Sequence, residues 1–221
     1  MHSVISDLTQ RANIPVVGIV GGVGAGKSSV VRSVSGLRLF VIDADRIGHE
    51  LLLTGDICQK LCDTFGNEIF NETGQVLRNR LAEKVFGDSD ELINNRNRLN
   101  EILHPAIRSE IHCSIKQAPQ DVDAIILDAA LLLEAGWADE CDAVIFIDTP
   151  VNLRQQRAAA NRGWSMEEFQ RREASQWSLL QKRQNAQFVV DNSGPVKVAA
   201  EQMKLVLEKI IERHGASGVL I

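Results

Sequence analysis

A glycine-rich stretch near the N-terminus has the residue types and spacing of a phosphate-binding loop. Residues 21–28 read Gly-Gly-Val-Gly-Ala-Gly-Lys-Ser, which matches the pattern G-x-x-x-x-G-K-[ST]. Glycines permit a sharp turn whose backbone amides converge on an anion. Lys27 is then expected to contact the β- and γ-phosphates, and the Ser28 hydroxyl to ligate Mg²⁺. The residues expected to hold a nucleoside triphosphate are Gly21, Gly22, Val23, Gly24, Ala25, Gly26, Lys27, Ser28 and Ser29.

The segments around the loop predict a strand before it and a helix after it. Residues 16–20 are almost entirely apolar, and apolar residues recur at helical spacing from Val30 to Leu37. Residues 39–42 form a short apolar run, as expected for a strand that is buried on both faces of a parallel sheet. This run ends in Asp43 and Asp45, at the strand edge where such folds bind ligands. Neighbouring residues of a strand face opposite sides of the sheet, and residues two apart share a side only where the strand continues. We therefore assign Asp43 and Asp45 no common role in advance.

Three more apolar runs predict further strands at residues 124–128, 143–148 and 188–191, and each ends in an aspartate. Five parallel strands joined by helices indicate an α/β fold with a doubly wound sheet. We divide the single unit 1–221 into a core (about 14–46, 119–153 and 186–214), a helical insert (about 47–118) and a basic segment (about 154–185). The last helix is predicted at 196–214, packed on the sheet.

A histidine precedes a proline within the predicted insert. His104 and Pro105 follow an apolar helical stretch, and Arg108 lies three residues further on. A residue before proline is biased towards extended backbone, so His104 is predicted to lie at a helix break. A histidine at such a break can bind a ligand, or it can simply cap or pack there.

The segment 154–185 concentrates cations in a chain that is acidic overall. Charge runs are usually solvated helix faces, which is the simpler reading. Guanidinium groups also suit phosphate geometry, however, and closing lids exclude water, so we predict a phosphate-binding lid. The seven cations are Arg154, Arg157, Arg162, Arg171, Arg172, Lys182 and Arg183.

Composition excludes several classes of protein. A formal net charge of −5 argues against a nucleic-acid partner, and no apolar run in the 221 residues approaches the roughly 20 needed to span a bilayer. Residues 1–14 do not resemble a secretory signal, so a cytoplasmic protein is expected. The four cysteines have no metal-binding spacing and are predicted to be free thiols. A monomer or a weak homo-oligomer is expected.

Other protein classes with this loop carry signatures that the chain lacks. A regulatory GTPase should have an Asn-Lys-x-Asp motif, and a transporter ATPase a Ser-Gly-Gly-Gln motif; neither occurs. A small-molecule kinase remains, since the loop, a carboxylate base and mobile arginines are all present. Another nucleoside or nucleotide kinase of the same fold, or a regulator that binds ATP without using it, stays open as an alternative.

Several motifs in order resemble those of the dephospho-CoA kinase family, from about residue 16 to 194. They are residues 21–28, the Val-Ile-Asp-Ala-Asp of 41–45, Phe65-Gly66, the Leu-Asn-Glu-Ile-Leu-His-Pro of 99–105, the Leu-Leu-Leu-Glu of 131–134, Gln176, and the Asp-Asn-Ser-Gly of 191–194. The resemblance implies a P-loop kinase fold with a nucleotide-binding core, a helical CoA-binding domain and a lid. It also implies Mg²⁺-dependent transfer of phosphate from ATP to the ribose 3′-hydroxyl of dephospho-CoA, which gives coenzyme A.

The resemblance also implies roles for individual residues. Asp45 matches the second aspartate of the family's pair and is expected to be the general base, while Asp43 is expected to position the metal or the substrate. His104 and Arg108 are expected near the acceptor, and Arg157 is the expected lid cation.

The chain departs from the family pattern in two places. Residues 130–134 read Ala-Leu-Leu-Leu-Glu, where the family usually has Pro-Leu-Leu-Phe-Glu. The family commonly has two lid arginines four residues apart, whereas here Asn161 follows Arg157 at that spacing and Arg162 comes one residue later. One residue on a helix is a rotation of about 100°, so Arg157 is the stronger candidate for the lid cation.

Overall fold

The computed structural model describes residues 14–87 and 89–217, with the side chain of Ser217 excepted. The prediction that the chain has no secretory signal rests on residues 1–14. Of these, only Ile14 is among the described residues. The described chain divides into two compact units, residues 44–114 and the residues on either side of them. The functional division into core, substrate-binding insert and lid stays a prediction. No helix in the described ranges is long and apolar enough to cross a membrane.

A parallel sheet forms the centre of the larger unit. Its five strands lie in the order β2-β3-β1-β4-β5, and every described pairing between them is parallel. The predicted doubly wound α/β sheet is therefore confirmed. The strands are β1 (Val16–Gly21), β2 (Leu39–Asp43), β3 (Ala124–Asp128), β4 (Ala143–Asp148) and β5 (Phe188–Asp191).

The position of β2 corrects one expectation. All six residues of β1 are buried at the centre of the sheet, but β2 is an edge strand and Val41 is 42% exposed. An apolar run of four residues indicates that a strand can be buried, but the place of the strand in the sheet decides whether both of its faces are covered. The prediction that this strand is buried on both faces was therefore wrong.

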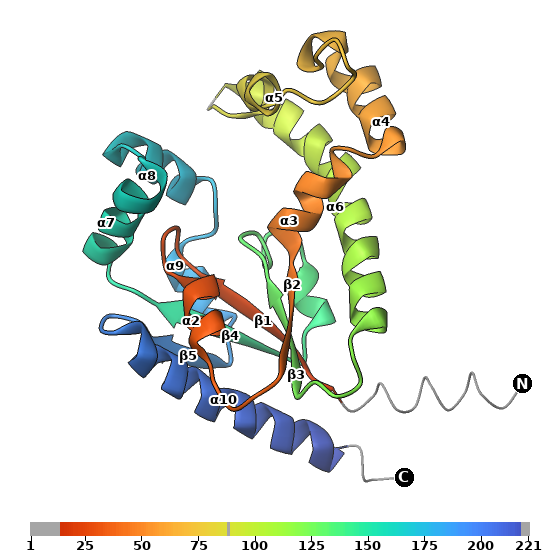
Figure 1. Ribbon diagram of the computed structural model, residues 1–221. Helices are drawn as coiled ribbons and strands as arrows, with labels where there is room; N and C mark the ends of the chain where they lie inside the picture. The colour runs from red at the N-terminus through yellow and green to blue at the C-terminus, as the bar shows by residue number, and fades with distance from the viewer. Residues whose placement is uncertain (1–13, 88, 218–221) are drawn as a thin grey trace, which may run out of the picture. The chain divides into compact units, whose positions relative to one another are not determined.

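Helices cover the sheet of the larger unit. Figure 1 shows α10 (Val196–Ser217) running along one face of the sheet beside α2 (Lys27–Ser33). Buried apolar residues from both helices and four strands form one cluster there, and burying such side chains contributes about 1.5–3 kcal/mol each. The other helical segments of this unit are η3 (Trp137–Glu140), α7 (Val151–Arg162), α8 (Met166–Ala174) and α9 (Leu179–Gln184).

The smaller unit is helical and has an apolar core of its own. Seven buried residues between Leu52 and Val85 form this core, and partly buried residues of the long last helix pack against it. The insert predicted from apolar spacing is thus helical, as expected. Its segments are α3 (Ala44–Leu51), α4 (Gly55–Phe65), η2 (Asn67–Ile69), α5 (Arg78–Val85) and α6 (Asp90–Gln117).

The helix break predicted at His104 does not occur. Helix α6 continues through this point for 28 residues, with Pro105 inside it. Proline removes one helical hydrogen bond and disfavours helix in the residue before it. Here Leu103 and Ala106 on either side of the pair pack against the insert core, and this burial outweighs the local preference. His104 is therefore a residue of a continuous helix.

Candidate active site

The predicted loop joins β1 to α2, and its glycines are required by its shape. Gly24 and Gly26 have φ angles of 73° and 82°, in the left-handed region that side chains rarely adopt. A Cβ atom on Gly24 would also lie 2.5 Å from the carbonyl oxygen of Arg154. Helix α2 begins at Lys27, directly after the loop. The first amides of a helix and its dipole favour an anion at this position.

One carbonyl of the loop is held by three donors. The Ala25 oxygen accepts hydrogen bonds from Asn192 Nδ2 at 2.8 Å, Thr149 Oγ1 at 2.9 Å and Arg157 Nη1 at 3.2 Å. Thr149 and Asn192 are buried, so water does not compete for these bonds. Because a trans peptide directs its N–H opposite its carbonyl, this clamp fixes the direction of the Gly26 amide.

An aspartate at the end of a strand contacts both Lys27 and Ser28 of the loop. Asp128 Oδ2 accepts a hydrogen bond from Ser28 Oγ at 2.6 Å, and Asp128 Oδ1 lies 3.9 Å from Lys27 Nζ. Asp128 ends β3, which pairs with β1, so sheet order brings this carboxylate to the loop. We predicted the strand and its terminal aspartate from the sequence but gave Asp128 no role. The available signal was an apolar strand that ends in Asp, and the missing information was which strand neighbours β1.

Ser28 and Asp128 fit a magnesium ion. Both present hard oxygen ligands, which Mg²⁺ prefers, and their oxygens are adjacent. No cluster of three or more acidic, histidine or cysteine ligands occurs among the residues described. Mg²⁺ sites commonly use one or two protein ligands, and water and substrate phosphates fill the remaining positions. Asp43 is paired with Asp128 in the sheet register, at the same edge.

A pocket of about 470 Å³ lies over the loop. Among the described residues that line it, four are cations and none is a carboxylate. A site with this charge favours an anionic ligand such as a polyphosphate. The lining includes residues 24–29 of the loop together with Arg32, Arg157, Ala158, Asn161, Arg162, Asn192 and Val196.

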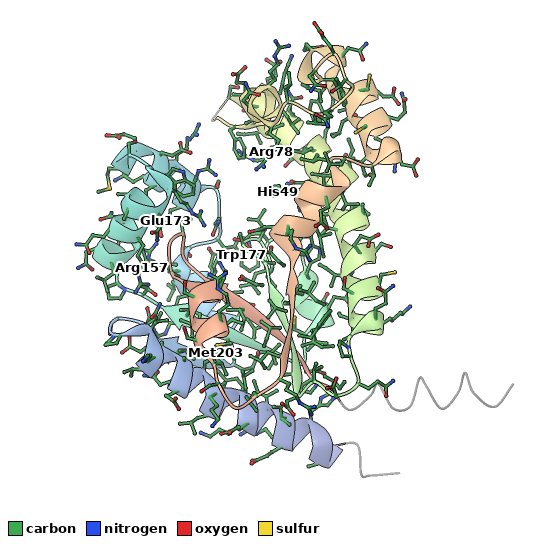
Figure 2. The ribbon with its side chains drawn as sticks, in the orientation of Figure 1. His49, Arg78, Arg157, Glu173, Trp177 and Met203 are labelled. Atoms are coloured by element: carbon green, nitrogen blue, oxygen red, sulfur yellow. The ribbon has the colours of Figure 1, made fainter. Side chains whose placement is uncertain are left out.

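Most of the cations predicted to form a phosphate lid are engaged within the protein. Arg154 is buried, pairs with Glu173 and donates to the Val23 carbonyl, so it stabilises the conformation of the loop. Only Arg157 and Arg162 of the seven line the pocket. Arg157 on α7 and Glu173 on α8 are labelled in Figure 2. The remaining ion pairs are Arg171 and Arg172 with Glu168, Lys182 with Glu134, and Arg183 with Asp148.

Three predicted residues lie in the smaller unit. Asp45 is exposed and lies in the first turn of α3. Because α3 begins directly after β2 ends, the strand does not continue to Asp45, and the alternation of strand faces does not apply to it. His104 and Arg108 are four residues apart on α6 and share one helix face. Burial lowers the pKa of His104, which favours its neutral form at pH 7. Their roles towards a substrate stay predictions.

The segment that departs from the family pattern is held by a buried lysine. Lys182 Nζ donates to Gln176 Oε1 at 2.8 Å and to the Ala130 carbonyl at 3.2 Å, and pairs with Glu134 Oε1 at 3.0 Å. Burial lowers the pKa of Lys182, and the Glu134 carboxylate partly offsets this. Glu134 also accepts from the Trp177 backbone at 2.8 Å. These contacts fix the segment although the family's proline and phenylalanine are absent at 130 and 133.

Glu134→Gln is expected to destabilise the protein by about 3 kcal/mol, because it leaves the Lys182 ammonium buried without its counter-ion. The measurement is the free energy of unfolding from urea titration. Asp148→Asn is the matched control, since it removes a carboxylate from an exposed pair with Arg183 and should cost no more than about 1 kcal/mol. Equal losses in both variants would contradict the role given to the buried pair.

The sheet, the loop and the strand-end aspartate together define a P-loop nucleotide-binding protein. Residues 15–197 match the family model of dephospho-CoA kinase. The chain is 36% identical over 198 residues to a dephospho-CoA kinase of Carboxydothermus hydrogenoformans, covering 89% of this chain and 94% of that protein. It is 34% identical over 195 residues to that of Aquifex aeolicus, covering 88% and 96%. The chain belongs to the dephospho-CoA kinase family.

Solved structures agree with this fold. The protein TT1252 from Thermus thermophilus superposes with a TM-score of 0.73 and is 26% identical, covering 89% of this chain and 98% of that one. A dephospho-CoA kinase from Campylobacter jejuni superposes with a TM-score of 0.57 at 22% identity, covering 89% and 97%.

Proposed function

We propose that this protein transfers the γ-phosphoryl group of ATP to the ribose 3′-hydroxyl of dephospho-CoA, by in-line displacement, and so produces coenzyme A. The observation that carries the proposal is Asp128 in contact with Ser28 and Lys27 of the loop, in a chain of this family. A regulatory nucleotide-binding protein would have the same loop. The proposal that this protein transfers a phosphoryl group therefore also depends on the acceptor-binding, base and lid residues described below.

The loop residues 21–29 bind and orient the triphosphate. Their amides and the start of α2 face the phosphates, and Lys27 supplies a mobile charge for the β- and γ-phosphates. Ser28 and Asp128 would hold Mg²⁺, with Asp43 at the same sheet edge as a further positioning carboxylate. Bound there, the ion neutralises charge that develops on the phosphate oxygens.

The acceptor is bound and deprotonated by residues of the helical unit. Asp45 is the general base that takes the proton of the acceptor hydroxyl. His104 and Arg108 bind the acceptor from one face of α6. A neutral His104, as its lowered pKa favours, acts there as a hydrogen-bonding group, and Arg108 carries the positive charge.

The segment 154–185 acts as a lid through Arg157. Of the three bonds to the Ala25 oxygen, that of Arg157 is the longest, and the other two donors keep the carbonyl satisfied when Arg157 moves to a phosphate. Arg157→Ala is expected to lower kcat about 10- to 100-fold and to change the ATP dissociation constant much less. Steady-state kinetics together with calorimetric ATP binding measure both effects. An unchanged kcat would remove Arg157 from the lid.

A small-molecule acceptor agrees with the net charge of −5, which disfavours an extended polyanion as partner. A cytoplasmic location, and a monomer or weak homo-oligomer, form part of the proposal.

The direct test is an assay that couples ADP release to a measurable signal, with ATP and Mg²⁺ present. Dephospho-CoA is the acceptor, and adenosine and nucleoside monophosphates are the controls. We expect rapid ADP release with dephospho-CoA and little with the controls. Preference for a nucleoside or its monophosphate would favour another kinase of this fold, and ATP binding without ADP release would favour a regulator.

A further inference from the structure

We propose that Arg162 is a second phosphate-binding cation of the nucleotide pocket, and that Trp164 is the residue that positions it. This inference rests on the proposed function only in taking ATP as the ligand. Arg162 is the last residue of α7 and lines the pocket together with Arg157 and the loop. No step of the mechanism above uses it.

An aromatic ring holds the Arg162 side chain. The guanidinium carbon of Arg162 lies 4.6 Å from the centroid of the Trp164 ring, and that of Arg172 lies 4.3 Å from the same centroid. Arg172 is itself held by Glu168, to which its Nε donates at 2.6 Å. The ring therefore has two cationic neighbours, and one of them is anchored to α8.

The Trp164 ring is in turn fixed next to the phosphate loop. It packs against a cluster formed by Val23, Ala158 and Phe169, and Val23 is a loop residue. Gly163, with a φ angle of 65°, ends α7 and allows the chain to turn. The Trp164 amide then donates to the Ala158 carbonyl at 3.4 Å. Loop, helix end and ring thus form one packed group.

A stacked arginine is well prepared to bind phosphate. Contact between its face and an indole ring leaves the N–H donors free in the guanidinium plane, where they can meet two phosphate oxygens. Holding the side chain in advance reduces the conformational entropy that is lost on binding. In addition, the pocket that Arg162 lines carries no carboxylate to compete for it among the described residues.

The simpler interpretation is that Arg162 only stabilises the end of α7. A cation in the last turn of a helix interacts favourably with the helix dipole, by about 0.3–1 kcal/mol. That role predicts a small loss of stability on substitution and no change in nucleotide affinity. It also gives no reason for a ring beneath the guanidinium group, so nucleotide binding separates the two interpretations.

The test is calorimetric binding of ATP and AMP to the whole protein without any acceptor. Arg162→Ala is expected to weaken ATP binding about tenfold and AMP binding less than twofold, because AMP lacks the β- and γ-phosphates. Arg162→Lys keeps the charge but not the planar fork, and should weaken ATP binding about threefold. Arg171→Ala is the matched control, because Arg171 belongs to the same basic segment but pairs with Glu168 and does not line the pocket, and it should leave both affinities within about twofold.

Substitutions of the ring test the positioning role. Trp164→Ala should weaken ATP binding about threefold, and Trp164→Phe, which keeps an aromatic face, should restore it to within about twofold. Wild-type ATP affinity in Arg162→Ala would overturn the proposal, and so would an equal loss for ATP and AMP. If Trp164→Phe binds ATP no more tightly than Trp164→Ala, the positioning role of the ring is overturned. Because no acceptor is present, these results do not depend on whether dephospho-CoA is phosphorylated.

Discussion

Replacing Asp45 with asparagine is expected to lower kcat by about two to four orders of magnitude and to leave the ATP dissociation constant within about twofold. Asparagine has nearly the same shape but cannot accept the proton of the acceptor hydroxyl. The loop that binds ATP lies in the larger unit and is unchanged by the substitution. Single-turnover kinetics with saturating ATP and dephospho-CoA measure the rate, and calorimetry measures ATP binding.

Asp56→Asn provides the matched control for this experiment. Asp56 and Asp45 are both exposed aspartates in the first turn of a helix of the same unit, so both variants lose the same interaction with a helix dipole. The control should retain kcat within about twofold. Near-normal turnover in Asp45→Asn, or an equal loss in Asp56→Asn, would remove Asp45 from the mechanism.

Replacing Asp128 with asparagine is expected to lower kcat by about two to three orders of magnitude and to raise the Mg²⁺ concentration needed for half-maximal activity. The amide oxygen can still accept the Ser28 hydroxyl, so the loop should keep its shape. What is lost is the negative charge next to Lys27 and the proposed metal ligand. The measurement is a Mg²⁺ titration of activity for both proteins.

Asp148→Asn is the control for Asp128, since each is the last residue of a strand that pairs in parallel with β1, on opposite sides of it. Asp148 pairs with Arg183 and is well exposed, so its substitution should leave the Mg²⁺ dependence unchanged. If Asp128→Asn shows the wild-type Mg²⁺ dependence and kcat, the carboxylate has no part in the metal site.

The local parts of the fold could be predicted from the sequence. A loop pattern at fixed spacing defined the residues from Gly21 to Ser28, and apolar runs located all five strands, because both signals depend only on neighbours in the chain. A doubly wound parallel sheet then follows from alternating strands and helices. The structure confirmed these predictions.

The features that depend on strand order could not be predicted correctly from the sequence. Asp128 is next to Ser28 only because β3 lies beside β1, and β2 is exposed only because it lies at the edge. An apolar run ending in aspartate occurs in several strands here, so the pattern alone does not select the one beside the loop. Pairing of strands that are distant in sequence supplies that information.

Burial overrode two local signals. The residues His104 and Pro105 suggested a break, but their neighbours pack against the insert core and α6 continues. The cation-rich segment suggested many phosphate ligands, whereas Arg154 and Lys182 are buried in ion pairs that stabilise the protein itself. Charge density along a chain does not show which charges meet a partner, because partners such as Glu134 come from distant segments.

The position of the transferred phosphoryl group tests the account most directly. Wild-type protein is incubated with ATP, Mg²⁺ and dephospho-CoA, and the product is examined by ³¹P NMR and mass spectrometry. The account predicts one added phosphate, on the ribose 3′-oxygen, formed together with an equal amount of ADP. ADP formed without a phosphorylated dephospho-CoA, or a phosphate at another position of the acceptor, would contradict it.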